Sequence, residues 1–139
     1  MATIIRAEIS EKNKYYIDKH RHYELKHFCL QYPEWKREYA TYSNVSPNIS
    51  NFEQIYSNGL KSDPTGNWVT KREYYAEKIN LIEKAALETD YILYKYILKA
   101  VTEGLSYTYL KSILRIPCSR DIYYNRYRKF FWILNKLRN

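Results

Sequence analysis

The chain has 139 residues, 45% of them hydrophobic, and a formal net charge of +8. That length fits one domain, or one domain with an appended lobe, and it is enough to fold without a disulfide or a metal. The two cysteines form no CxxC pair, so we expect reduced thiols in a cytoplasmic protein. Because the chain has no long apolar run, we expect neither a signal peptide nor a membrane-spanning helix.

Helices are favoured along the whole chain, because only three glycines and four prolines interrupt it. We therefore predict an all-α fold, a bundle of about five to seven helices. The N-terminal helical region, residues 1–42, begins with a polar stretch over 1–12. Apolar spacing then predicts a helix over 13–32, and Pro33 suits the start of a second helix over 34–42.

A polar linker is predicted over residues 43–69, which are rich in Ser, Asn, Pro and Gly. A capping box at 50–53 and Gly59 predict one short helix within it. The sequence SDPTG at 62–66 predicts a turn. The linker leads into the C-terminal domain, residues 70–139.

Two further helices open this C-terminal domain. Thr70 begins a capping box, and the helix after it should reach about Thr89. Asp90 is a candidate cap for the next helix. Gly104 should end that helix, because glycine accepts the left-handed backbone that closes many helices.

The end of the chain has the pattern of a helix-turn-helix. Ser106 should cap a short brace helix over 107–114, and residues 115–118 should form the turn, since the residue before a proline avoids helical geometry. Ser119 should cap a long last helix. Apolar residues that recur every three or four positions predict the buried stripe of that helix: Tyr123, Tyr127, Phe130, Leu134 and Leu137.

Positive charge is concentrated in the same segment. Residues 104–139 hold eight basic residues and one acidic residue, Asp121. A localised positive field on a pair of helices attracts the phosphate backbone of a nucleic acid. The alternative is that these charges only form a solvent-exposed helix face on a protein-interaction domain.

The helix-turn-helix interpretation assigns a role to each residue type, because a DNA-binding helix-turn-helix needs basic and polar groups near the start of its second helix. Arg120, Asn125 and Arg128 are the candidate base-reading residues, since arginine can pair with guanine and asparagine with adenine. The full set of candidate DNA-binding residues is Ser106, Tyr107, Lys111, Arg115, Ser119, Arg120, Tyr124, Asn125, Arg126, Arg128 and Lys129.

The segment GLSYTYLKSILRIPCSRDIYY resembles the helix-turn-helix of region 4 in sigma-70-type factors. The matching residues are Gly104, Leu105, Ser106, Leu110, Leu114 and Ile116. Two positions depart from the pattern. If Ile122 is the buried residue of the last helix, the turn is one residue longer than usual, and Pro117 replaces a small polar residue.

More of the chain, roughly residues 20–138, is similar to phage-encoded and prophage-encoded regulators of the RinA and ArpU kind. The Tyr32-Pro33 step, the polar linker, the capped helix and the C-terminal reader carry this resemblance. It implies a sequence-specific transcriptional regulator of phage late genes in the cytoplasm of a bacterial host cell. Its partners would be double-stranded DNA, RNA polymerase and a second copy of the chain.

Two alternatives remain open: a phage protein-binding module that inhibits or redirects a host protein, and a DNA-packaging subunit like a small terminase. Trp35 and Trp132 are candidate protein-interface residues, because exposed tryptophans often anchor partners. We expect no enzyme, since no catalytic motif is present, and no cofactor. We also expect no metal site, because the cluster of His20, His22, His27 and Cys29 lacks a ligand pair at a standard spacing.

Overall fold

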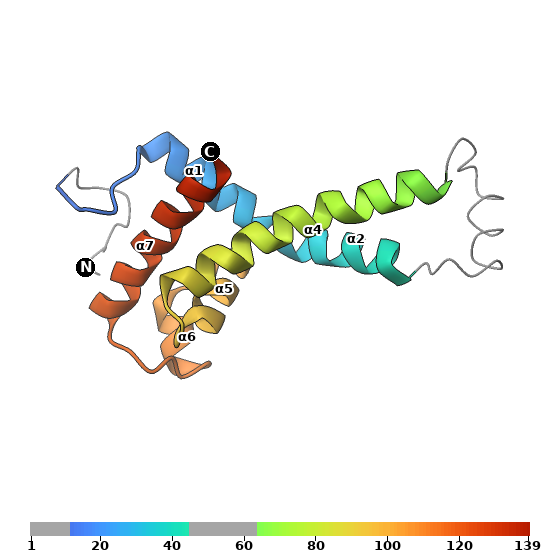
Figure 1. Cartoon of the computed structure of the whole chain (residues 1–139). Helices are drawn as coiled ribbons and strands as arrows, with labels where there is room; N and C mark the ends of the chain where they lie inside the picture. Colours follow the sequence, from blue (N-terminus) through green and yellow to red (C-terminus); the bar gives the residue numbers. More distant parts are fainter. Residues whose placement is uncertain (1–11, 45–63) are drawn as a thin grey trace. The chain divides into compact units, whose positions relative to one another are not determined.

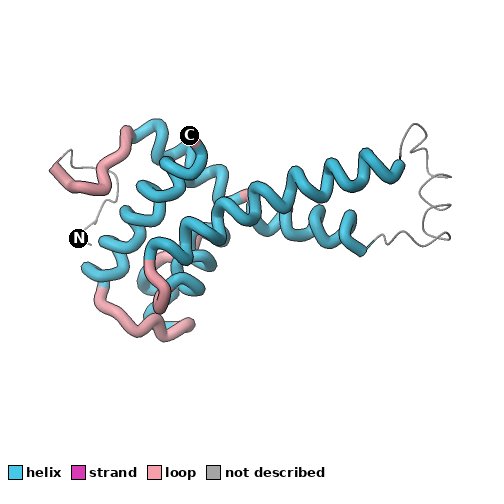
Figure 2. The backbone as a smooth tube through the Cα atoms, in the orientation of Figure 1, coloured by secondary structure: helices cyan, strands magenta, loops and turns pink. Residues whose placement is uncertain are grey.

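Helices are the only regular elements in residues 12–44 and 64–139, which are the residues that this computed structural model describes (Figures 1 and 2). They are α1 (Lys19–Leu30), α2 (Tyr32–Asn44), α4 (Pro64–Thr89), α5 (Tyr94–Glu103), α6 (Tyr107–Ser112) and α7 (Arg120–Arg138). The all-α prediction is therefore confirmed. The predicted polar stretch up to residue 11 and the predicted short helix at 50–59 lie outside the described residues.

The chain divides into two units, which differ from the predicted domains. One unit combines residues 1–32 with 81–139, and the other consists of residues 33–80. In the first unit α1, α5 and α7 pack against one another in pairs. The N-terminal helix α1 thus belongs with the C-terminal helices, because its apolar face packs on them.

The core of the first unit contains three of the five residues in the predicted stripe of α7, whereas Tyr127 and Leu137 are only half-buried. Tyr123, Phe130 and Leu134 are almost fully buried, with 1%, 0% and 0% of their surface exposed. From α1, His22 packs edge-on against Phe131 of α7, with ring centroids 4.8 Å apart. Since His22 and Cys29 are buried while His20 and His27 are exposed, this histidine cluster is split between core and surface.

Two helix starts differ from the sequence predictions. The first helix begins at Lys19 and not at residue 13, because the side chain of Asp18 accepts the backbone N–H of His20 at 3.1 Å and caps the helix there. The helix α4 begins at Pro64, six residues before Thr70. Proline is tolerated in a first helical turn, where its missing N–H needs no partner. The predicted turn at 62–66 is therefore wrong from Pro64 onward.

Only some of the other helix boundaries of the first unit agree with the sequence predictions. Asp90 does not cap α5, whose N-cap is Leu93 without a side-chain cap hydrogen bond, and α6 ends at Ser112, two residues before its predicted end. Gly104 ends α5 with φ of 70°, and its N–H donates to the carbonyl of Ala100. A side chain at this position would be strained by the left-handed backbone. The short connection to α6 therefore depends on glycine.

Residues 33–80, the second unit, bury Trp35, which the sequence suggested as an exposed anchor. Its side chain is 7% exposed, and the Nζ atom of Lys78 lies 5.4 Å from its ring centroid. Tyr42 stacks on Tyr75 in the same unit, with centroids 6.1 Å apart. The prediction of an exposed Trp35 is corrected, because its side chain is buried within the chain.

Candidate nucleic-acid interface

Serine side chains begin both helices of the predicted helix-turn-helix. Ser106 Oγ accepts the N–H of Tyr109 at 3.1 Å, and Ser119 Oγ accepts the N–H of Ile122 at 3.3 Å. Each serine satisfies a backbone donor that the first turn of its helix would otherwise leave unpaired. Both predicted caps are confirmed, so the starts of α6 and α7 are fixed by short-range hydrogen bonds.

The turn between these helices is held to the core at two points. Ile116 is 1% exposed, and its N–H donates to the carbonyl of Leu110 at 2.9 Å. The hydroxyl of Tyr107 donates to the carbonyl of Cys118 at 2.7 Å. Since Tyr107 is 8% exposed, we remove it from the predicted DNA-contacting set and assign it to bracing the turn.

A left-handed residue lies in the middle of the turn. Arg115 has φ of 57°, a backbone conformation in which glycine is the residue without a steric cost. Its side chain is exposed. An arginine at this position therefore accepts backbone strain and places a cation at the outer surface of the turn.

Three exposed cations surround the turn, one from each of its parts: Lys111 of α6, Arg115 of the turn and Arg120 of α7. The guanidinium of Arg120 lies 5.5 Å from the centre of the Tyr107 ring, which limits its motion. No carboxylate among residues 12–44 and 64–139 forms an ion pair with any of the three. We call Lys111, Arg115 and Arg120 the turn cations.

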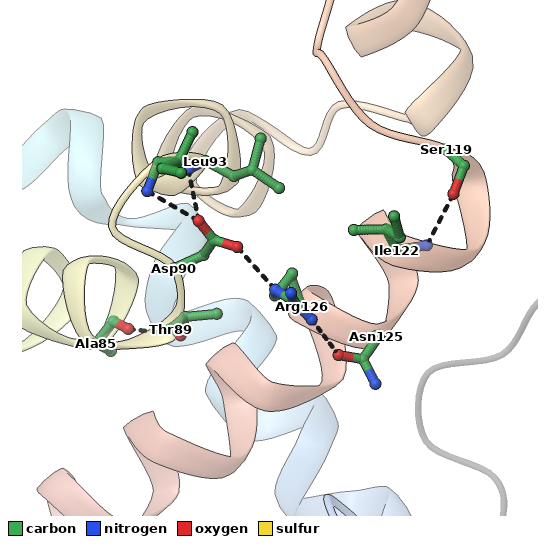
Figure 3. A network of polar contacts seen from close by, with 9 residues as sticks. Ala85, Thr89, Asp90, Leu93, Ser119, Ile122, Asn125 and Arg126 are labelled. Carbon is green, nitrogen blue, oxygen red and sulfur yellow. Dashed lines mark hydrogen bonds and ion pairs between the residues drawn. The ribbon is translucent and has the colours of Figure 1, made fainter.

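Arg126 is not available in the way the sequence predicted. Its Nε donates to Asp90 Oδ2 at 2.7 Å and its Nη1 donates to Asn125 Oδ1 at 2.6 Å, as Figure 3 shows. Asp90 Oδ1 also accepts the N–H groups of Ile92 and Leu93 at 2.8 and 2.9 Å. The predicted phosphate contact of Arg126 is therefore corrected, because its guanidinium joins α7 to the α4–α5 loop.

The pKa of Asp90 lies below its ordinary value of 3.8. Partial burial acts to raise this pKa, but the hydrogen bonds from Arg126 and from the two backbone N–H groups together outweigh burial. The carboxylate therefore stabilises the folded chain above the ordinary pKa, and this contribution is lost as the pH falls through the lower, folded-state pKa.

Asp90→Asn is expected to lower the free energy of unfolding by about 1–2 kcal/mol at pH 7, because the Arg126 guanidinium loses a partly buried, charged acceptor. The wild type and the variant should converge only when the pH falls below the lowered pKa of Asp90 in the folded chain, where the carboxyl group is neutral in both folded and unfolded chains. Urea unfolding at a series of pH values measures the difference. A difference that stays constant down to low pH contradicts the ion-pair account.

The first turn of α7 exposes Ile122 and buries Tyr123. Ile122 is 45% exposed, so the condition under which the turn would be one residue longer than usual is not met. Tyr123 is 1% exposed, and its hydroxyl has no hydrogen-bond partner among the described residues. Burial raises the pKa of Tyr123, and the neighbouring Tyr127 and Tyr124 raise it further.

Tyr123→Phe is expected to raise the free energy of unfolding by about 1 kcal/mol, because the change removes a buried hydroxyl that has no partner and keeps the ring. Chemical denaturation of the two proteins under one condition measures this gain. A loss of stability would show that the hydroxyl makes a hydrogen bond in solution.

The remaining predicted residues of α7 lie half-buried. Tyr124 packs edge-on against Tyr123 with centroids 5.0 Å apart, and the Nε atom of Arg128 is buried without a hydrogen-bond partner among the described residues. Lys129 is partly exposed. Trp132 is covered in part within the chain by Tyr15, whose ring centre lies 5.4 Å away. This half of α7 thus offers less open surface than the turn cations do.

Burial raises the pKa of Cys118, while Lys111 acts in the opposite direction and only partly offsets this effect. The thiol is therefore not an activated nucleophile in this state. No group of three or more His, Cys, Asp or Glu residues capable of holding a metal ion occurs in the described part of the chain. None of the helices over 12–44 and 64–139 has the length and apolarity needed to cross a membrane.

Comparison with protein-family models, with curated proteins and with solved structures finds no match to this chain.

Proposed function

We propose that the chain binds double-stranded DNA through α6, the turn and the first half of α7, and that it acts as a transcriptional regulator. One observation carries this proposal: three exposed cations, not ion-paired within residues 12–44 and 64–139, surround a turn whose two flanking helices are both fixed by serine caps. Phosphate contacts from such groups position a reader on the duplex. The helix that starts at Arg120 would then lie in the major groove.

The regulatory role rests on the resemblance to RinA and ArpU proteins, and late-gene activation in a phage is its most specific form. A single helix-turn-helix domain of this size contacts only a short DNA site. A second copy of the chain or RNA polymerase is therefore the expected protein partner. Ser106 and Ser119 are exposed caps in this arrangement and add polar groups near the phosphates.

Duplex binding is tested by fluorescence anisotropy on a labelled duplex of random sequence, with salt varied from 50 mM upward. Four or five phosphate contacts should give a log–log dependence of the binding constant on salt with a slope of about −4. An absence of duplex affinity at 50 mM salt would overturn the proposal.

A second candidate function, binding to a host protein, is favoured by one other observation. Tyr91 and Ile92 are 81% and 77% exposed in the loop between α4 and α5. Two adjacent, exposed apolar side chains are a surface that a protein partner could cover. Replacing both with serine should leave duplex affinity unchanged if DNA is the partner. If the protein-binding candidate is correct, wild-type duplex affinity is absent and the double variant loses the host-protein complex.

A further inference from the structure

The second unit, residues 33–80, is electrically neutral. It contains six basic and six acidic residues, so the whole net charge of +8 lies in the first unit. Because net charge keeps like proteins apart, two copies of the chain repel each other through their first units. Through their second units they can approach without net repulsion.

The described helices of this unit form an antiparallel pair (Figure 1). Tyr42 of α2 stacks on Tyr75 of α4, while Lys78, further along α4, lies against Trp35, nearer the start of α2. Two helices bury only the strip between them unless another element covers their outer faces. Among the described residues of the unit, the buried apolar side chains are only Trp35 and Ile79. The other large apolar side chains are half-buried or exposed: Tyr39, Tyr42, Trp68, Val69, Tyr74 and Tyr75.

Tyr74 is the most exposed of these side chains, at 55%. Lys71 lies three residues before it and Glu77 three residues after it, and both are exposed. Residues three apart on a helix are neighbours on its surface, so we call Lys71, Tyr74 and Glu77 the Tyr74 surface. Neither charged residue forms an ion pair with a described residue. The Nζ atom of Lys71 lies 5.6 Å from the ring centre of Tyr42, and a contact this weak at an exposed site leaves the ammonium group able to pair with a carboxylate.

We propose that a second copy of the chain packs on the Tyr74 surface, with the two α4 helices antiparallel and a two-fold axis beside Tyr74. In that arrangement, residues at equal distances before and after Tyr74 lie at the same height along the two helices. Lys71 of each copy then lies at the height of Glu77 of the other, so the surface is complementary to itself. A two-fold contact of this kind closes as a dimer and does not continue into a filament.

This inference assigns a surface to one partner of the proposed function, the second copy of the chain, but it does not depend on duplex binding. Two copies joined through their second units would carry two helix-turn-helix segments. A regulator that recognises two half-sites needs such a pair.

Sedimentation equilibrium of the full chain at several concentrations measures the dimer. The wild type should approach twice the 17.0 kDa mass of one chain. Lys71→Glu alone and Glu77→Lys alone each place like charges at the same height on the two helices, so each should raise the dimer dissociation constant at least about tenfold. Circular dichroism checks that the variants keep their helices.

Two rescue experiments identify the pairing. The double variant Lys71→Glu/Glu77→Lys reverses both charges and restores complementarity, so its dissociation constant should return to within about threefold of the wild-type value. An equal mixture of the two single variants should form a mixed dimer, because one chain then carries two acids on this surface and the other carries two bases.

The matched control is Lys95→Glu, which changes an exposed lysine of α5 in the first unit. It alters the net charge by the same amount as Lys71→Glu and should not weaken the dimer. Because both substitutions lower the net positive charge, general repulsion between copies cannot explain a weaker dimer for Lys71→Glu.

A wild type with the mass of one chain at every concentration would overturn the inference, as would a dimer that neither single variant weakens. Weakened single variants that neither the double variant nor the mixture restores would contradict the two-fold pairing. Anisotropy on a labelled duplex tests the proposed function separately. A monomer that binds duplex sinks only this inference, whereas a rescued dimer that binds no duplex sinks only the proposed function.

Discussion

Replacing the three turn cations together is expected to weaken duplex binding at least about 100-fold at 50 mM salt. The substitutions are Lys111→Gln, Arg115→Asn and Arg120→Gln. Each phosphate contact releases a counterion that is worth on the order of 1 kcal/mol at that salt concentration, so three contacts give the expected loss. The log–log slope should fall from about −4 to about −1, since each contact accounts for about 0.9 of it.

The choice of residues follows from the geometry of the turn. Arg115 has φ of 57°, and asparagine tolerates this left-handed conformation better than most residues, so its charge is removed without disturbing the backbone. Arg120 lies over the ring of Tyr107, and circular dichroism with thermal unfolding checks that its loss leaves the fold intact.

A matched control removes the same charge from other exposed lysines of the first unit: Lys84→Gln, Lys95→Gln and Lys99→Gln. Lys84 and Lys99 pair with Glu88 and Glu103 at 3.8 and 3.0 Å, so they form ion pairs along their own helices. If the control variant loses as much affinity as the turn variant, binding depends on net charge and the turn cations have no special role. Anisotropy titrations at several salt concentrations compare the two.

The predictions made from the sequence are correct where a short-range interaction determines the structure. Ser106, Ser119 and Gly104 lie where predicted, because a cap needs a hydroxyl three residues before its N–H donor and a left-handed closing residue needs glycine. The buried stripe of α7 likewise follows from the helix period, which is a property of the backbone alone.

The missed features depend on segments that are far apart in the chain. Asp90 and Arg126 are separated by 36 residues, so no local pattern links them, and a basic residue on a basic helix gave no sign of an ion pair. Trp35 lies in a polar stretch, yet the folded chain buries it. The exposure of Ile122, in contrast, agrees with the predicted stripe, because a stripe through Tyr123 places Ile122 outside the core.

Phe130→Ala is expected to lower the free energy of unfolding by about 3–5 kcal/mol, the usual range for deleting a fully buried aromatic ring. Phe130 is 0% exposed and packs edge-on against Phe131, with centroids 5.0 Å apart. Phe130 belongs to the core and not to the candidate DNA-binding surface. The variant should therefore lose duplex affinity only in proportion to the fraction of protein that is unfolded.

The control for Phe130→Ala is Ile122→Ala on the same helix. Ile122 is 45% exposed, so its truncation should cost less than about 1 kcal/mol. Urea unfolding measures both, and an unchanged dependence on denaturant concentration would show that the two variants expose the same surface on unfolding. Similar losses for the two substitutions would contradict the packing described for α7, because they would place Ile122 in the core. A small loss for Ile122→Ala beside a large one for Phe130→Ala would confirm the rotation of α7 about its axis, in which Asp121 and Ile122 face away from the core.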